Sequence, residues 1–357
     1  MEDDFDYLFK RNIARMDFKS RIDHHKHHPE QSLKEYKKES DKQIEIEVTP
    51  MKKIYLDTYI WINMLKALQN HDKSSIYYDI FQILKIKVRA GILICPFSET
   101  LFTEVLKQSD LASRRATAQV ADVLSANFCI KPFYYIVQCE VFNLNLFLKG
   151  QDGAIESYKW SKAIGLIGDL KLSSNETTPE SLLLQKCIYD GTLLTSIQEI
   201  IADHDQFKHS NDISNWHTDF FNMVKKKQES SSVNNLDKIL INELTSSFKS
   251  VAEFLNLGNL SISSDFIKCN MSAIKNYCSL LFTFSSIHAY LQRDKSRIIK
   301  INDFYDIIHS SLAIGTCDYL FTERSFAALI KTLKLDNLYN IGVHSNPNEI
   351  LKIIDEI

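Results

Sequence analysis

Acidic residues stand at three points of the chain where an open parallel sheet would place its ligands, after a strand or on the following helix. Asp57 directly follows an apolar run that predicts a buried strand. Glu104 lies on the helix predicted after the next such run, and Asp306 and Asp318 lie in a late acidic segment. Converging carboxylates suit Mg²⁺ and Mn²⁺, which activate water and stabilise charge on phosphate. These positions therefore predict a hydrolytic site for phosphodiesters.

The elements that would position these acids alternate between strand and helix. Apolar β-prone runs at 53–56 and 92–95 predict buried strands, and apolar residues at helical spacing follow each run. Ser98 is the predicted N-cap of the helix that carries Glu104. Such alternation predicts a parallel sheet with right-handed crossovers. The remaining predicted elements are helices over 75–89, 303–313 and 325–333, strands over 319–321 and 338–341, and a last helix opened by Pro347.

Two stretches depart from this alternation. Residues 1–50 contain 10 Lys and Arg and 12 Asp and Glu, with few apolar residues at a helical period, so we expect a marginal helix or a disordered arm. Residues 112–299 show helical periodicity without strands and are predicted to be a helical insertion. The predicted organisation is a charged arm at 1–50, an α/β domain in two parts at 51–111 and 300–357, and the insertion at 112–299 between the parts.

The histidine-rich run from His24 to His28 leaves two interpretations open. Four histidines this close can bind a transition metal, but no second group of ligands is apparent, and an incidental solvated run is favoured. The more interesting alternative is that the arm docks a regulatory partner or a neighbouring subunit.

Composition excludes several classes of protein. The chain has 357 residues with only 9 Gly and 6 Pro, too few for the turns of an all-β protein. A net charge of −3 predicts no general surface for polyanions. The uncharged run 276–292 contains Asn, Ser, His and Gln and is too short to span a membrane. The acidic N-terminus and 7 cysteines without a CxxC pair predict a reduced, cytoplasmic protein with no membrane partner.

Three segments together resemble the PIN (PilT N-terminus) domain family of metal-dependent nucleases. They read IYLDTYIW, FSETLFTEVLK and NDFYDIIHSSLAIGTCDYLFTERSF, and the resemblance covers roughly residues 52–110 and 300–345. It implies a PIN-like three-layer α/β/α domain with a central parallel sheet, here interrupted by a large all-helical insertion. The interval of about 200 residues between the second and third acids is far longer than in compact family members.

The resemblance also implies a set of site residues. The metal ligands would be Asp57, Glu104, Asp306 and Asp318. His309, which only some relatives carry, lies one helical turn after Asp306 in the predicted helix and is a further candidate catalytic residue. Supporting roles fall to Thr58, Asp303, Thr322 and Glu323, the last of which replaces the usual Asp.

Ordinary structural roles remain open for several of these residues. Asp57, Asp303 and Asp306 are placed to cap or begin helices, where acids are favoured without any function. Glu99 is an alternative to Glu104 as the second acid, and His309 is equally compatible with a core position. Basic residues near the two acidic segments could bind phosphates or be a solvated surface, namely Lys107, Arg114, Arg115, Arg293, Arg297 and Lys300.

The expected function is a Mg²⁺- or Mn²⁺-dependent endonuclease that leaves a 5′-phosphate and a 3′-hydroxyl. RNA is the favoured substrate, and the family implies a bacterial toxin or defence effector. A haloacid dehalogenase-like phosphatase is excluded, because that class needs a second Asp at the position of Tyr59. The alternatives are a catalytically silent PIN-like scaffold that binds RNA or a partner protein through the insertion, and a DNA nuclease or nickase.

Overall fold

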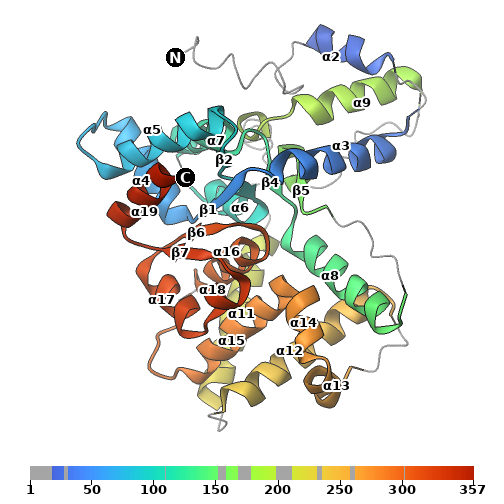
Figure 1. The fold of residues 1–357 in the computed structure, drawn as a ribbon, viewed down its shortest axis with the longest axis vertical. Coiled ribbons are helices and arrows are strands. Elements are labelled where there is room, and N and C mark those ends of the chain that lie inside the picture. The colour runs from blue at the N-terminus through green and yellow to red at the C-terminus, as the bar shows by residue number, and fades with distance from the viewer. Residues whose placement is uncertain are drawn as a thin grey trace. The chain divides into compact units, whose positions relative to one another are not determined.

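The computed structural model describes residues 18–27, 31–108, 110–151, 158–167, 178–197, 211–230, 235–257, 262–300 and 302–357 (Figure 1). The chain divides into two compact units. The first unit comprises 1–131, 158–205 and 345–357, and the second comprises 132–157 and 206–344. Both units are mixed α/β and mostly helical.

The first unit contains two small sets of strands. Strand β1 pairs with β2 in parallel, with Lys52 opposite Leu93. Strand β3 pairs with β4 in parallel, and β4 pairs with β5 antiparallel. The strands are β1 (Lys52–Leu56), β2 (Leu93–Ile94), β3 (Phe97–Ser98), β4 (Cys129–Ile130) and β5 (Trp160–Ser161).

Helices pack around these strands. Helix α5 contacts α4, α7 and β2, and it lies beside α19 from the far end of the sequence (Figure 1). The Lys87 ammonium donates to the Asp355 carbonyl at 2.8 Å, which ties α5 to α19. The helices are α2 (Phe18–His25), α3 (Leu33–Val48), α4 (Thr58–Gln69), α5 (Ile76–Arg89), α6 (Glu99–Leu106), α7 (Leu111–Ser125), α9 (Pro179–Gly191) and α19 (Pro347–Glu356), with a 3₁₀ turn at Ala163–Ile167.

In the second unit, helices surround α15 (Ser279–Arg293), and a parallel pair of strands follows α16. The Glu140 carboxylate accepts hydrogen bonds from the Ser279 hydroxyl and the Leu280 amide, at 3.0 and 3.1 Å, and so caps α15. The other elements are α8 (Phe133–Leu148), α11 (Asn211–Ser230), α12 (Leu236–Phe254), α13 (Ser264–Cys269), α14 (Met271–Tyr277), α16 (Asp303–Thr316), β6 (Tyr319–Phe321), α17 (Arg324–Thr332), α18 (Leu335–Tyr339) and β7 (Gly342–His344).

The predicted mixture of helices with parallel strands is confirmed, but two strand predictions are wrong. The segment 112–299 is not all helical, because it contains β4 and β5, which are too short to show an alternating pattern. The strand predicted at 338–341 is the end of α18, and β7 begins at Gly342 instead. Lys334 and Asn340 both adopt left-handed backbone conformations, which bound the short helix and shift the strand along the chain.

The described part of residues 1–50 differs from the marginal arm that composition led us to expect. Helix α3 begins with a capping box, in which the Ser32 hydroxyl accepts from the Glu35 amide and the Glu35 carboxylate accepts from the Ser32 amide. Helices α2 and α3 both pack on α9, and α3 also packs on β5. These contacts within the first unit give the charged helices a surface on which to fold.

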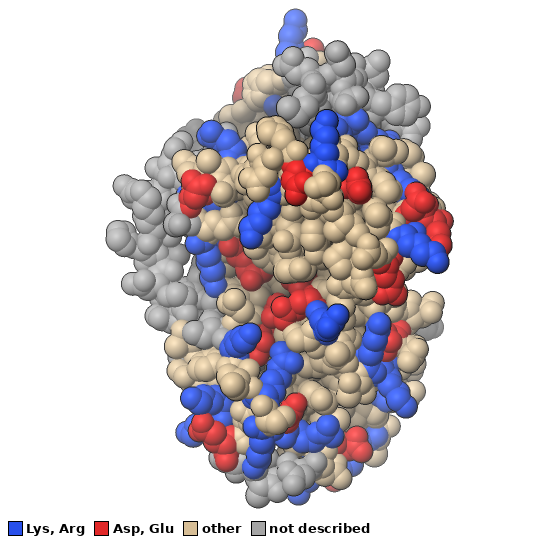
Figure 2. Space-filling view, turned by 90° about the vertical axis from the view of Figure 1, so that its left-hand side faces the viewer, with Lys and Arg blue, Asp and Glu red and all other residues tan. Residues whose placement is uncertain are grey.

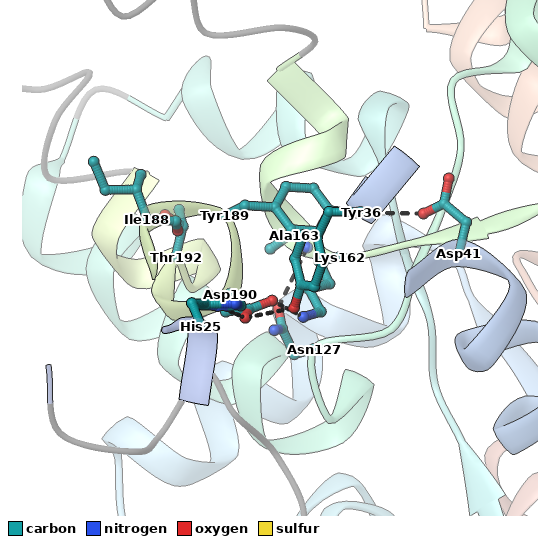
Figure 3. A network of polar contacts seen from close by, with 10 residues as sticks. All are labelled: His25, Tyr36, Asp41, Asn127, Lys162, Ala163, Ile188, Tyr189, Asp190 and Thr192. Carbon is teal, nitrogen blue, oxygen red and sulfur yellow. Dashed lines mark hydrogen bonds and ion pairs between the residues drawn. The ribbon is translucent and has the colours of Figure 1, made fainter. Parts of the chain in front are cut away.

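A buried carboxylate, Asp190, holds α2 and α3 against α9 (Figure 3). Its Oδ2 atom lies 2.7 Å from His25 Nε2 and accepts a hydrogen bond of 2.7 Å from the Tyr36 hydroxyl. Lys162 forms an ion pair with Oδ1. Burial alone would raise the pKa of Asp190, but the contacts with His25 and Lys162 hold that pKa below its usual value. The carboxylate is therefore charged, and these three partners all belong to its own unit.

A second ion pair holds the middle of α3. Asp41 accepts from the Lys131 ammonium at 2.6 Å and from the Tyr189 hydroxyl at 3.3 Å. Since Tyr189 and Asp190 are adjacent on α9, the two acids are parts of one polar network (Figure 3).

Among the described helices, none combines the length and the apolar character that crossing a lipid bilayer requires.

Candidate active site

Asp57 is a buried carboxylate at the carboxyl end of β1. It stands at the N-cap position of α4 with extended backbone angles, and its carbonyl accepts from the Ile60 amide at 2.9 Å. Its side chain makes no capping hydrogen bond to the helix, although it is only 3% exposed. The capping role that the sequence left open is therefore not what this carboxylate does.

Glu104 is tied to the residue that follows Asp57. The Thr58 hydroxyl donates a hydrogen bond to Glu104 Oε2, which joins the first turn of α4 to α6. The packed side of α6 holds Leu101 and Val105, which fixes the direction of Glu104. The structure thus brings Asp57, Thr58 and Glu104 into one neighbourhood of the first unit.

Glu99, the alternative second acid, has different surroundings. It opens α6 after Ser98, whose hydroxyl accepts from the Leu101 amide and so caps the helix as predicted. The Glu99 side chain is exposed to solvent over part of its surface, and desolvation by the neighbouring protein atoms raises the pKa of its carboxyl. The bond from Thr58 therefore favours Glu104 as the acid that accompanies Asp57.

The second unit places its predicted residues around β6 and the helix before it. Asp306 and His309 are one turn apart on α16; Asp306 is half-buried and His309 is 2% exposed. Asp318 precedes β6, and its carbonyl accepts from the Gly342 amide at 3.0 Å. Thr322 follows β6, is buried, and donates its amide to the His344 carbonyl at 3.0 Å. Asp318 and Thr322 thus bracket β6 beside its parallel partner β7.

Asp303 has a structural role within the second unit. Its carboxylate accepts from the Lys300 amide at 2.9 Å and from the Arg297 guanidinium at 3.2 Å. The same guanidinium lies 5.0 Å from the centre of the Phe326 ring. Asp303 therefore organises the loop before α16, and much of Arg297 is committed to that task.

Glu323, the predicted substitute for an acidic ligand, is exposed at the N-cap position of α17. Its Oε1 atom accepts from the Ser325 hydroxyl at 2.5 Å, and it makes no capping bond to the helix. A ligand role is not indicated by these contacts.

The basic residues predicted to bind phosphate differ in exposure. Lys107, Arg115 and Lys300 are exposed, and Arg293 lies 5.2 Å from the centre of the Tyr290 ring. Partial desolvation by neighbouring protein atoms lowers the pKa of Lys107, while the nearby Glu104 carboxylate opposes that shift. On the face drawn in Figure 2, the described Lys and Arg side chains are interspersed with Asp and Glu. Phosphate contacts on that face would therefore come from individual Lys or Arg side chains and not from a continuous basic patch.

The chemistry of the donors fits a hard divalent cation. Within the described residues, no three His, Cys, Asp or Glu side chains lie close enough together to form a metal site by themselves. The first unit supplies two candidate carboxylate ligands, Asp57 and Glu104. Mg²⁺ and Mn²⁺ prefer oxygen ligands of this kind. In the histidine-rich run, His25 is engaged by Asp190, and His28 lies outside the described residues.

Sequence reasoning did not identify Tyr59 and Tyr77 as a pair. The ring of Tyr59 on α4 contacts the ring of Tyr77 on α5, and Tyr59 follows Asp57 by two residues. An aromatic residue just after a candidate ligand was the available signal, but its partner 18 residues away could not be recognised from spacing.

Comparison of the chain with protein-family models, with curated proteins and with solved structures found no match.

Proposed function

We propose that the chain is a metal-dependent endonuclease with a PIN-like fold that hydrolyses phosphodiester bonds. The observation that carries this proposal is the environment of Asp57. Asp57 stands at the end of a parallel strand, does not cap its helix, and lies beside the Thr58–Glu104 hydrogen bond. Such a placement is typical of a functional carboxylate.

In this proposal Asp57, Glu104, Asp306 and Asp318 hold one or two Mg²⁺ or Mn²⁺ ions. The bound metal would supply an activated water and neutralise charge on the phosphate. Thr58 orients Glu104 through its hydroxyl, and His309, buried one turn after Asp306, is better placed to position that residue than to meet substrate.

RNA is the substrate that we favour, on the resemblance of the three sequence segments to PIN nucleases. A role as a bacterial toxin or defence effector has the same basis. Cleavage of DNA and a catalytically silent scaffold are the competing outcomes of the experiment.

The proposal is tested by incubating the full chain with labelled single-stranded RNA and DNA in Mn²⁺, Mg²⁺ or EDTA. Asp57→Asn and Asp306→Asn change one acid in each unit while keeping its size. Asp79→Asn and Asp265→Asn, at exposed positions on α5 and α13, are the matched controls. Binding of Mn²⁺ is measured by calorimetry on the same proteins.

Metal-dependent cleavage that both site variants lose, and both controls keep, is the expected result. Each site variant should also bind Mn²⁺ more weakly while retaining its helical circular dichroism. Equal inertness of all the proteins, together with no Mn²⁺ binding by the wild type, would overturn the nuclease and favour the scaffold.

A further inference from the structure

Tyr59 is an exposed aromatic side chain in the first turn of α4, two residues after Asp57. It is 47% exposed, whereas Ile60 and Trp61 beside it are buried in the first unit. Thr58, which binds Glu104, is in the same turn. The ring therefore projects from the short segment that carries Asp57 and the hydroxyl that binds Glu104.

Tyr77 on α5 holds the Tyr59 ring in place. The ring centres are 6.3 Å apart with an angle of 84° between the planes, and the Tyr77 hydroxyl donates to the Tyr59 hydroxyl at 3.1 Å. Burial and this hydrogen bond raise the pKa of Tyr77, so its hydroxyl remains a donor at neutral pH. A ring fixed in advance loses little further freedom when a ligand binds.

Because the two tyrosine rings are perpendicular, they do not stack face to face on each other. Phe147 and Tyr277 in the second unit provide a contrast, since their rings stack at 4.6 Å and each covers a face of the other. Of these two aromatic pairs, the tyrosines of the first unit, with the exposed Tyr59 ring, are the better receptor for a third planar group.

A cation lies along the same side of α4. Asn63 and Lys66 follow Tyr59 at intervals of four and seven residues, which places them on one helical face. The Lys66 side chain is exposed, and the Asn63 amide donates to the Tyr59 carbonyl at 2.7 Å. An aromatic ring followed by a cation suits a nucleotide strand, because the ring stacks a base and the cation meets a phosphate.

We propose that Tyr59 stacks on an unpaired nucleobase beside the scissile phosphate and that Lys66 contacts the backbone of the same strand. The substrate class is therefore single-stranded nucleic acid, since bases inside a duplex are stacked on each other and offer no free face. This inference rests on the proposed nuclease, because only a catalytic role of Asp57 and Glu104 would place a scissile phosphate beside the stacked base. The stacking contact is nevertheless measurable by binding alone.

The test measures fluorescence anisotropy of a labelled single strand, and of the corresponding blunt duplex, with the full chain in EDTA and in Mg²⁺. Tyr59→Ala is expected to weaken single-strand binding by roughly five- to 150-fold, the range that loss of one stacked base gives. Tyr59→Phe should keep most of the affinity, and duplex binding should be the same in all three proteins. Tyr134→Ala is the matched control, because Tyr134 is a 52% exposed tyrosine on α8 in the second unit.

The salt dependence of binding distinguishes the role of Lys66 from that of Tyr59. Lys66→Gln should reduce the slope of log affinity against log salt by about 0.7, the value for one phosphate contact with a single strand. Tyr59→Ala should leave this slope unchanged, because a stacked base releases no counterion. If Tyr59→Ala changed the slope as much as Lys66→Gln, the stacking assignment would be wrong.

The outcomes separate this inference from the proposed nuclease. Tyr59-dependent binding by a wild type that neither cleaves nor binds Mn²⁺ would support stacking and overturn the nuclease. Cleavage and single-strand affinity that survive Tyr59→Ala would support the nuclease and overturn stacking. No binding by the wild type in either buffer would overturn the stacking proposal. An effect of Tyr59→Ala confined to self-association in sedimentation experiments would assign the ring to a protein interface and also overturn it.

Discussion

The hydroxyl of Thr58 donates a hydrogen bond to the carboxylate of Glu104, and this contact joins the helix after β1 to the helix after β3. The residue before Thr58 is the buried Asp57, whose side chain does not cap α4. This hydrogen bond thus ties Glu104 to the residue that directly follows Asp57. This relationship distinguishes Glu104 from Glu99, which the sequence alone could not do.

Removal of the Thr58 hydroxyl should weaken metal binding without unfolding the chain. Thr58→Val keeps the shape of the side chain but removes the hydroxyl that donates to Glu104. Loss of an outer contact to a metal ligand typically costs 10- to 100-fold in affinity. Thr58→Ser should restore most of it. The measurement is calorimetric titration with Mn²⁺, with Glu99→Gln as the control that is expected to leave the affinity unchanged. An equal loss in Glu99→Gln and Glu104→Gln would contradict the assignment of Glu104.

Replacement of Asp190 should release α2 and α3 from α9. Asp190→Asn leaves His25, Tyr36 and Lys162 facing a neutral amide, and breaking a buried pair of this kind costs about 3–5 kcal/mol. Urea unfolding would report the loss of stability, and limited proteolysis would report earlier cleavage near the N-terminus. Asp23→Asn is the control, because its ion pair with Lys26 is exposed and should contribute little.

Acid should destabilise the second unit through Glu243. Burial alone would raise the pKa of this residue, but His288 at 2.7 Å and Lys227 at 2.8 Å lower it to about 2. A folded-state pKa below the ordinary 4.5 gives stability that is present above pH 4.5 and is lost as pH falls toward 2. The full effect is on the order of 3 kcal/mol.

Thermal melting between pH 7 and roughly pH 3 would measure this loss. Glu243→Gln should lower the melting temperature at pH 7 and flatten its dependence on pH in this range. If the melting temperature of Glu243→Gln fell with decreasing pH as steeply as that of the wild type, other carboxylates would be the cause of the acid sensitivity.

Those parts of the fold that depend on local signals were predictable from the sequence. Ser75 caps α5, Ser98 caps α6, and Pro347 opens α19, because a capping side chain or a proline acts within a few residues. The predicted strands at 53–56 and 319–321 are also present, because each is a short apolar run that packs into the core.

The remaining features depend on partners that lie far away in the chain. His25 and Asp190 are separated by 165 residues, so composition could not show that the charged N-terminal helices have a buried anchor. Strands β4 and β5 have two residues each and are defined by pairing rather than by pattern. In the candidate site, the acids could be listed from spacing, but the Thr58 bond that selects Glu104 required the structure.

Loss of the Glu140 carboxylate should destabilise the helix at the centre of the second unit. Glu140 accepts from the Ser279 hydroxyl and from the amides of Leu280 and Leu281, at 3.0, 3.1 and 3.3 Å, so one side chain serves three donors at the start of α15. Its negative charge also opposes the positive end of the helix dipole. Glu140→Ala removes both effects and should cost about 1–3 kcal/mol in urea unfolding.

Glu140→Gln separates the two contributions, because an amide oxygen still accepts a hydrogen bond but carries no charge. Its free energy of unfolding should lie between those of the wild type and Glu140→Ala. Glu253→Ala, an exposed acid near the end of α12, is the control and should change stability by less than about 0.5 kcal/mol. Equal stability of Glu140→Ala and the control would show that α15 does not depend on this cap.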